Sequence, residues 1–200
     1  NQIADHYGVK TIDVLTGFKF IGEQIGLLEK AGRLDDYIFG FEESYGTLSS
    51  TYVRDKDAIG GAFMVCEMFA YYKTQGISLL EKLEDLYKQY GYRLNTLHSY
   101  VFEGLAGFEK MQEIMKHFHQ GIDEFGGRKV VKTLDYSQGL DGLPKSDVLK
   151  YLLEGESSVV VRPSGTEPKL KAYVSIVSDT MEESEATEKK VADQLAEYMK

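Results

Sequence analysis

The spacing of apolar residues changes near residue 92, and this change constrains the fold more than any other feature of the 200-residue chain. Before residue 92, short apolar runs alternate with segments whose apolar residues recur every three or four positions, as on one face of a helix. This strand, loop, helix order predicts an α/β layer with a mostly parallel sheet. After residue 92, extended runs are interspersed with helical patterns, and two of these runs flank a tight loop. We therefore expect a smaller α+β domain with an antiparallel sheet there.

The first half is expected to contain two strands and three helices. The predicted strands cover Thr11–Leu15 and Tyr37–Phe39. Asp57 can cap the second helix, and Ser78 with Glu81 forms a capping box for the third. The inward faces predicted for the three helices are Ile21, Ile25 and Leu28; Ile59, Ala62, Phe63, Cys66 and Phe69; and Leu83, Leu86, Tyr87 and Tyr90.

The second half contains four segments with strand-like patterns and three with helix-like spacing. The expected strands are Tyr92–Phe102, Lys129–Leu134, Ser158–Val161 and Leu170–Val177, and the expected helices are Glu109–Phe118, Asp147–Leu153 and Thr180–Met199. The terminal helix should open with a capping box at Thr180 and Glu183. We place the boundary between the two predicted domains near residue 92, so that they cover residues 1–92 and 93–200.

Net charge and cysteine content restrict the class of protein. The net charge of -9 argues against nucleic acid and anionic membrane surfaces as partners, because both select clustered Lys and Arg. No apolar run approaches the roughly 20 residues of a membrane-spanning helix. Cys66 is the only cysteine, which excludes an intrachain disulfide and favours a reducing, cytoplasmic location. The chain opens without an initiator Met, in what reads as the middle of a helix, so we expect part of a longer protein.

Acidic residues and histidines do not combine into a metal motif. Asp55 and Asp57 are two carboxylates without a further acidic neighbour, too few for a Mg²⁺ or Ca²⁺ loop. His117 and His119 lie two positions apart on a predicted helix, so their rings point in different directions. We expect all four histidines to be structural or exposed, and no metal to be held by this chain.

The segment Arg162-Pro163-Ser164-Gly165-Thr166-Glu167-Pro168-Lys169 has the composition of a phosphate-binding loop between two strands. Arginine can bond two phosphate oxygens at once, hydroxyl groups add donors, and a glycine lets backbone amides turn inward. In the strand that follows, Lys169 and Lys171 share one face because side chains alternate. The alternative interpretation is a hairpin turn with a surface arginine.

Three segments of the first half could hold a polar ligand such as a sugar. Gly40-Phe41-Glu42-Glu43-Ser44-Tyr45-Gly46 follows a predicted strand, and ligands of open α/β sheets bind beyond the carboxyl ends of strands. Thr16-Gly17-Phe18-Lys19 follows the preceding strand, and Arg54-Asp55-Lys56-Asp57 precedes a helix. The alternatives are an acidic solvated loop, an ordinary strand-to-helix turn, and an N-cap with surface charge.

Taken together, these loops resemble those of the α-D-phosphohexomutase superfamily. The matching pieces are Leu15 to Lys19, Gly40 to Gly46, Arg54 to Asp57 and Arg162 to Pro168, in the order in which the superfamily has them. The phenylalanine in the second piece and the Arg-Asp-Lys-Asp run are most similar to the bacterial phosphoglucomutase members. The resemblance implies a truncated three-layer third domain, the sugar-binding one, at residues 1–92 and the phosphate-binding fourth domain at 93–200.

The resemblance also implies roles for individual residues. Contacts to the sugar fall to Thr16, Gly17, Glu42, Ser44 and Lys56. Contacts to the phosphate group that is not transferred fall to Arg162, Ser164, Gly165, Thr166 and Lys171. No catalytic residue is expected in this chain, because the superfamily's phosphoserine loop and its Asp-rich Mg²⁺ loop have no counterpart in it.

The implied reaction converts glucose 1-phosphate to glucose 6-phosphate through a phosphoserine and a glucose 1,6-bisphosphate intermediate. Mg²⁺ and the N-terminal domains of the same polypeptide are the implied cofactor and partner. This chain would supply substrate recognition, and alone it is expected to be inactive. Two alternatives stay open. One is a phosphomannomutase or phosphopentomutase-like enzyme, and the other is a non-catalytic module that binds sugar phosphates.

Overall fold

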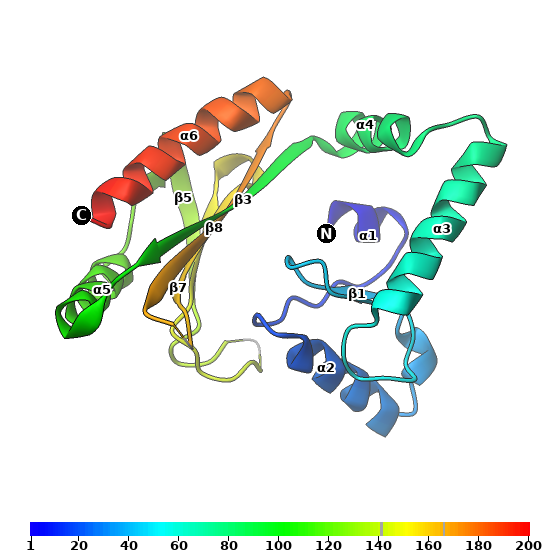
Figure 1. Cartoon of the computed structure of the whole chain (residues 1–200), viewed down its shortest axis with the longest axis horizontal. Coiled ribbons are helices and arrows are strands. Elements are labelled where there is room, and N and C mark those ends of the chain that lie inside the picture. Colours follow the sequence, from blue (N-terminus) through cyan, green and yellow to red (C-terminus); the bar gives the residue numbers. More distant parts are fainter. Residues whose placement is uncertain (141, 166) are drawn as a thin grey trace. The chain divides into compact units, whose positions relative to one another are not determined.

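The computed structural model describes residues 1–140, 142–165 and 167–200. The described residues divide into two compact units, Asn1–Asp85 and Leu86–Lys200 (Figure 1). The first unit contains α1 (Gln2–His6), α2 (Phe18–Lys30), η1 (Leu34–Asp36), β1 (Gly40–Phe41), β2 (Thr47–Leu48), α3 (Ala58–Thr74) and the start of α4 (Leu79–Tyr90). The second contains the end of α4, β3 (Tyr92–Val101), α5 (Gly104–His119), β4 (Glu124–Phe125), β5 (Arg128–Asp135), β6 (Leu149–Leu153), η2 (Glu154–Glu156), β7 (Ser158–Pro163), β8 (Lys169–Ser178) and α6 (Met181–Tyr198).

The first unit is organised around a small apolar cluster on α2. Phe18 and Ile25 of this helix pack with Leu48 of β2, and all three side chains are buried. The Tyr37 hydroxyl donates a hydrogen bond to the Leu48 carbonyl oxygen over 2.8 Å. The cluster therefore fixes the β1–β2 hairpin on the N-terminal part of α2.

The mixed α/β fold is confirmed, but the two strands predicted in the first half are wrong. The segments Thr11–Leu15 and Tyr37–Phe39 are irregular, and the nearest strand begins at Gly40. Among the described residues of this unit, the only sheet is the antiparallel β1–β2 pair, so the expected parallel sheet is not formed. A short apolar run becomes a strand only where another strand satisfies its backbone groups.

The inward face predicted for α3 is also wrong, although the predicted caps of α3 and α4 are confirmed. On α4, Leu86, Tyr87 and Tyr90 of the predicted face are half-buried and Leu83 is exposed. Ile59 and Phe63 on α3 are 84% and 65% exposed, Cys66 is exposed, and α3 buries no residue. An apolar stripe shows which side of a helix prefers to be buried. Within this unit, no described element buries the apolar stripe of α3. Asp57 Oδ1 accepts the Ile59 amide over 3.0 Å. The Glu81 amide donates to the Ser78 hydroxyl over 3.1 Å, and the Ser78 amide donates to the Glu81 carboxylate over 2.8 Å.

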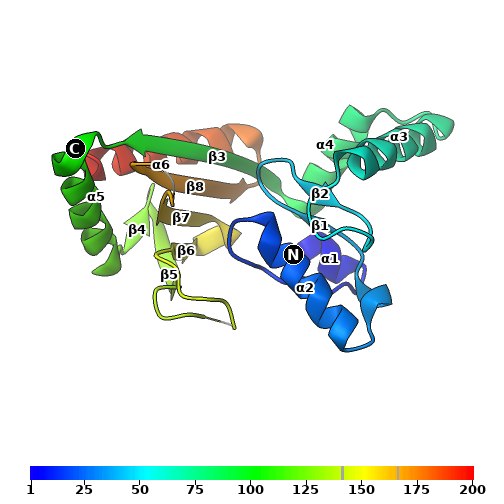
Figure 2. The same ribbon diagram turned by 60° about the horizontal axis from the view of Figure 1, so that its bottom comes forward.

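In the second unit, the described residues form a six-stranded antiparallel sheet in the order β3-β8-β7-β6-β5-β4. Helices α5 and α6 bury their apolar sides against one face of it (Figures 1 and 2). The predicted helices at 109–118 and 180–199 and the strands at 92–102, 129–134, 158–161 and 170–177 are confirmed within a few residues. Thr180 Oγ1 accepts the Glu183 amide, as the predicted cap requires.

The helix predicted over Asp147–Leu153 is wrong, because this segment forms strand β6. Leu149, Tyr151 and Leu153 are buried in the core, while Lys150 and Leu152 between them point to the opposite face. Alternation with a period of two is the property of a strand. The segment is too short for periodicity to separate helix from strand, and pairing with β5 and β7 decides the outcome.

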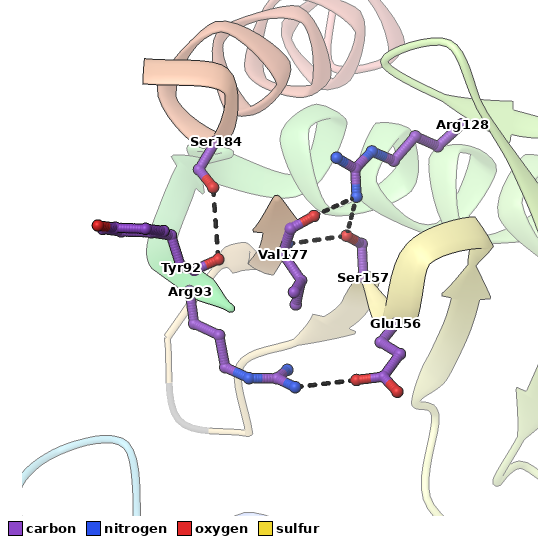
Figure 3. Close-up of polar contacts among 7 residues, drawn as sticks. All are labelled: Tyr92, Arg93, Arg128, Glu156, Ser157, Val177 and Ser184. Carbon is purple, nitrogen blue, oxygen red and sulfur yellow. Dashed lines mark hydrogen bonds and ion pairs between the residues drawn. The ribbon is translucent and has the colours of Figure 1, made fainter. Parts of the chain in front are cut away.

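The end of the sheet away from the β7–β8 connection is held by a group of polar contacts (Figure 3). The Arg128 guanidinium donates to the Val177 carbonyl oxygen over 2.7 Å and also to the Ser157 hydroxyl. The Ser157 hydroxyl in turn accepts the Val177 amide over 3.0 Å. Arg93 and Glu156 form an ion pair over 3.0 Å at the same end. These contacts link β3, β5, β8 and the segment at η2 at this end of the sheet.

Candidate functional site

The predicted phosphate loop connects β7 to β8 and has well-defined ends. The Ser164 amide donates to the Lys169 carbonyl oxygen over 2.7 Å, which closes the hairpin. The Phe102 amide donates to the Pro168 carbonyl oxygen over 2.9 Å, which attaches the loop to the end of β3. Ser164 is half-buried and Gly165 is exposed. Thr166, predicted to contact the phosphate, lies outside the described residues.

Two cations face each other at the base of this loop. Arg162 of β7 and Lys171 of β8 are directly opposite residues in the antiparallel ladder, so their side chains share one face of the sheet. Both are half-buried. Like charges directly opposite each other on a sheet are destabilising, and within the described ranges neither cation forms an ion pair. A bound anion would turn this repulsion into attraction.

The third cation of the loop, Lys169, is already paired. Its ammonium lies 2.8 Å from a carboxylate oxygen of Glu167. This contact is the main cause that lowers the pKa of the exposed Glu167 carboxyl, and Lys171 adds a smaller electrostatic contribution. Lys169 is therefore less available to a ligand than Arg162 and Lys171 are.

In the first unit, the predicted sugar loop forms the connection of the β1–β2 hairpin. The Glu42 amide donates to the Gly46 carbonyl oxygen over 2.9 Å. A Cβ atom on Gly46 would lie 2.5 Å from Glu42 Oε1, so the glycine leaves room for the Glu42 side chain to fold back over the loop. Ser44 lies at the exposed tip, and Tyr45 beside it has a left-handed backbone with φ of 65°.

The other two predicted sugar segments meet at the start of α2. Gly17 has φ of 123°, which favours glycine, and it begins the helix directly after the exposed Thr16. The Lys56 ammonium lies 5.9 Å from the centre of the Phe18 ring, beside this turn. The Lys56 ammonium also forms an ion pair with Asp55 over 3.2 Å. The hydrogen bond from the Lys56 amide and then the contact with the Lys56 ammonium lower the pKa of the Asp55 carboxyl.

A backbone hydrogen bond connects two of the predicted sugar segments. The Asp57 amide donates to the Thr47 carbonyl oxygen over 2.8 Å, which links the end of the Glu42 hairpin to the segment that carries Lys56. Within the described residues, no hydrogen bond or ion pair joins Glu42 or Ser44 to Thr16 or Lys56.

The described acidic residues of the two predicted sugar segments do not form a site for the Mg²⁺ that the resemblance implies. The Asp55 carboxylate is bonded to Lys56, and the Asp57 carboxylate caps α3 and accepts the Tyr52 hydroxyl. In the part of the chain that the structure describes, no three His, Cys, Asp or Glu side chains group as metal ligands. A separate search of the same residues finds no helix long and apolar enough to cross a membrane.

One cation near the phosphate loop was missed from the sequence. Lys150 of β6 points to the same face of the sheet as Arg162, because its neighbours Leu149 and Tyr151 are buried. The alternation of apolar residues at 149, 151 and 153 was the available signal, and the prediction of a helix there hid it.

Comparison with known proteins finds related domains along most of the chain. The family model described as phosphoglucomutase/phosphomannomutase, alpha/beta/alpha domain III, matches residues 1–90. The model of the C-terminal domain of the same family matches residues 105–198. The chain is 39% identical over 191 residues to a phosphoglucomutase of Staphylococcus aureus, covering 88% of the chain. It is 37% identical over 190 residues to a phosphoglucomutase of Staphylococcus epidermidis, covering 89%.

The relatives are much longer than this chain. It spans 33% of the Staphylococcus aureus protein and 34% of the Staphylococcus epidermidis protein. The fold also matches the crystal structure of pp63/parafusin from Paramecium, titled a phosphoglucomutase in its open form. This match has a TM-score of 0.68 and 24% identity, and it covers 99% of the chain and 35% of the Paramecium protein. The two family models and the curated relatives agree, and the chain belongs to the phosphoglucomutase/phosphomannomutase family, matching its domain III and its C-terminal domain.

Proposed function

We propose that this chain is the substrate-recognition part of a phosphoglucomutase that interconverts glucose 1-phosphate and glucose 6-phosphate. The observation that carries the proposal is the pair of opposed cations, Arg162 and Lys171, at the base of a loop within the match to the C-terminal domain. The relatives named phosphoglucomutase give the reaction and the sugar. The domains 1–92 and 93–200 then have separate tasks, sugar binding in the first and phosphate binding in the second.

The phosphate of the substrate is proposed to bind at the β7–β8 loop. The Arg162 guanidinium can donate two parallel hydrogen bonds to phosphate oxygens, and the Lys171 ammonium adds a second positive charge from the facing strand. The Ser164 hydroxyl, the Gly165 amide and the Thr166 hydroxyl complete the donors. Since both cations stand on a rigid sheet, the site is organised before the ligand arrives.

The sugar is proposed to bind at the hairpin loop and the start of α2. The Glu42 carboxylate accepts hydrogen bonds from sugar hydroxyls, and the Ser44 hydroxyl can donate or accept. Lys56 and the Thr16–Gly17 turn line the same site. A mutase must hold its substrate in two orientations, so hydroxyl recognition and phosphate recognition are best separated in this way.

Phosphoryl transfer itself is assigned to groups outside this chain. A phosphoserine, Mg²⁺ and glucose 1,6-bisphosphate belong to the reaction of the longer protein, which we expect to be cytoplasmic, and its N-terminal domains are the proposed partner. The chain alone is therefore expected to bind sugar phosphates without turning them over. It supplies positioning, which together with electrostatics carries most of phosphoryl-transfer catalysis.

Calorimetric titration of the chain with glucose 1-phosphate tests the proposal. We expect saturable binding that Arg162→Ala weakens at least about tenfold, since a bidentate contact to an anion is lost. Arg33→Ala is the matched control, because Arg33 is an exposed arginine paired with Asp36 on the first unit. Equal effects of the two substitutions, or no saturable binding by the unchanged chain, would refute the proposed function. Mannose 1-phosphate and ribose 1-phosphate in parallel titrations distinguish the sugar.

A further inference from the structure

The proposed phosphate subsite at Arg162 and Lys171 has an anion of the protein's own beside it, the carboxylate of Glu167. Its Oε1 atom lies 2.8 Å from the ammonium of Lys169, the first residue of β8. Lys169 and, more weakly, Lys171 lower the pKa of the Glu167 carboxyl, so the carboxylate acts on both lysines. A bound phosphate and Glu167 therefore compete for the same positive charges.

The backbone of the loop organises the contact between Glu167 and Lys169. The Lys169 amide donates to the Glu167 carbonyl oxygen over 2.7 Å, and Pro168 between them has a restricted φ. The Lys169 carbonyl oxygen in turn accepts the Ser164 amide over 2.7 Å. The two charged side chains are 29% and 50% exposed, and solvent weakens ion pairs of this kind. A dianion bound next to the pair can therefore draw Lys169 away from Glu167.

Lys169 is within reach of a ligand at the subsite. Along β8 the buried residues alternate with half-buried ones, so Lys169 and Lys171 point to the same face of the sheet as Arg162. Two residues along a strand are about 7 Å apart, and the flexible stem of a lysine spans that gap. Lys150 lies one row further from the loop and has an interaction of its own, so the argument does not need it.

The charges around the subsite balance a phosphate monoester only when Glu167 is counted. Arg162, Lys169 and Lys171 supply three positive charges, and Glu167 leaves a net charge of two. A phosphate monoester is a dianion once its second proton, with a pKa near 6, is lost. Without the carboxylate the subsite would carry an excess of positive charge. Tighter binding of the ground state alone does not speed up a reaction, and a mutase must release this phosphate to turn its intermediate around.

We propose that Glu167 is an internal counter-anion of the phosphate subsite, which holds Lys169 in an ion pair and thereby limits the affinity of the subsite for phosphate monoesters. The inference rests on the proposed function. It makes Glu167 and Lys169 a pair that sets how tightly the substrate is held. Removal of the carboxylate should strengthen binding, although most substitutions next to a binding site weaken it.

The test compares Glu167→Gln with Asp193→Asn in the 200-residue chain. Asp193 is an exposed carboxylate paired with Lys189 over 2.6 Å on α6, so both substitutions remove one negative charge and one exposed ion pair. Calorimetric titration with inorganic phosphate and with glucose 1-phosphate at low ionic strength should show binding about threefold to fivefold tighter for Glu167→Gln. Asp193→Asn should leave both affinities unchanged. At 1 M salt, where the Debye length is about 3 Å, the gain should disappear.

A double-mutant cycle with Lys169→Met separates the capture of Lys169 from simple repulsion between Glu167 and the ligand. In a chain that already carries Lys169→Met, Glu167→Gln should raise the affinity less than about twofold, because no cation is released. Equal gains with and without Lys169, or no gain from Glu167→Gln, would overturn the role of Glu167 while Arg162→Ala still weakens binding. Loss of the Arg162→Ala effect in the same titrations would overturn the proposed function itself.

Discussion

Replacing Lys171 by Met removes one of two cations that face each other across β7 and β8, so it should stabilise the unliganded chain. Directly opposite residues have Cβ atoms about 4.5–5.5 Å apart, which puts the charges of Arg162 and Lys171 about 6 Å apart. Coulomb's law gives about 0.7 kcal/mol for that distance in water and about 2.8 kcal/mol at an effective dielectric constant of 20. Both side chains are half-buried, and Glu167 attracts Lys171, so we expect a gain of about 0.5 kcal/mol.

The assay is urea unfolding of the unchanged chain and of Lys171→Met in a phosphate-free buffer of low ionic strength. With an m-value of about 1–3 kcal/mol per M, a gain of 0.5 kcal/mol raises the unfolding midpoint by about 0.2–0.5 M. At 1 M salt the Debye length falls to about 3 Å, and the difference between the two proteins should disappear. Lys132→Met is the control, since Lys132 faces Leu152 and has no opposed cation.

Addition of ligand should reverse the order of stability. A ligand at 100 times its Kd stabilises the unchanged chain by about 2.7 kcal/mol, and Lys171→Met should lose most of this gain. The reasoning is refuted if Lys171→Met is less stable than the unchanged chain at low salt without ligand. It is also refuted if both proteins respond equally to glucose 1-phosphate.

Two further predictions concern the sugar loop and a histidine of the second unit. Gly46→Ala should displace the Glu42 side chain, because the new Cβ would lie 2.5 Å from Glu42 Oε1. Titrations should then show weaker binding of glucose 1-phosphate and unchanged binding of inorganic phosphate. An unchanged affinity for glucose 1-phosphate would contradict this prediction. Burial alone would lower the pKa of His119, but Asp147 and Asp135, at 2.9 and 3.2 Å from its two ring nitrogens, outweigh burial and raise it. A raised folded-state pKa means that the stabilisation is complete below pH 6.5 and is lost as the pH rises through the folded-state value. Urea unfolding should therefore show the unchanged chain losing stability relative to His119→Gln above pH 6.5. Parallel pH profiles of the two proteins would contradict the stabilising contacts of His119 with Asp135 and Asp147.

The second half of the chain was largely predictable because its strands find their partners within the same segment. Leu170, Ala172, Val174 and Ile176 alternate over a full strand, and all four are buried as the period of two predicts. The segment 149–153 is shorter, and its apolar residues fit either a helix or a strand. Its identity follows from the neighbouring strands β5 and β7, which no local pattern encodes.

The first half was less predictable because its apolar patterns show which side of a helix prefers burial but not which element covers that side. Ile59 and Phe63 form a clear stripe on α3, yet both are exposed. A stripe of this kind stabilises a fold only where another element covers it. The caps at Asp57 and Ser78 were predictable for the opposite reason, since each depends only on the next three residues.

The candidate site shows the same division between local and non-local information. The composition of the loop at 162–169 indicated an anion site directly from the sequence. That Arg162 faces Lys171, and that Lys150 is the diagonal neighbour of Arg162, depends on the register of three strands. Register is set by the whole sheet, so charge placement across strands cannot be read from one strand at a time.

The central claim is that this chain recognises a sugar phosphate through two separate loops, and amide-resolved NMR of the 200-residue chain tests it most directly. Titration with glucose 1-phosphate should shift the amides of residues 162–165 and those of residues 42–46. Inorganic phosphate should shift only the first group. Shifts confined to other regions, or identical shift patterns for the two ligands, would contradict the account.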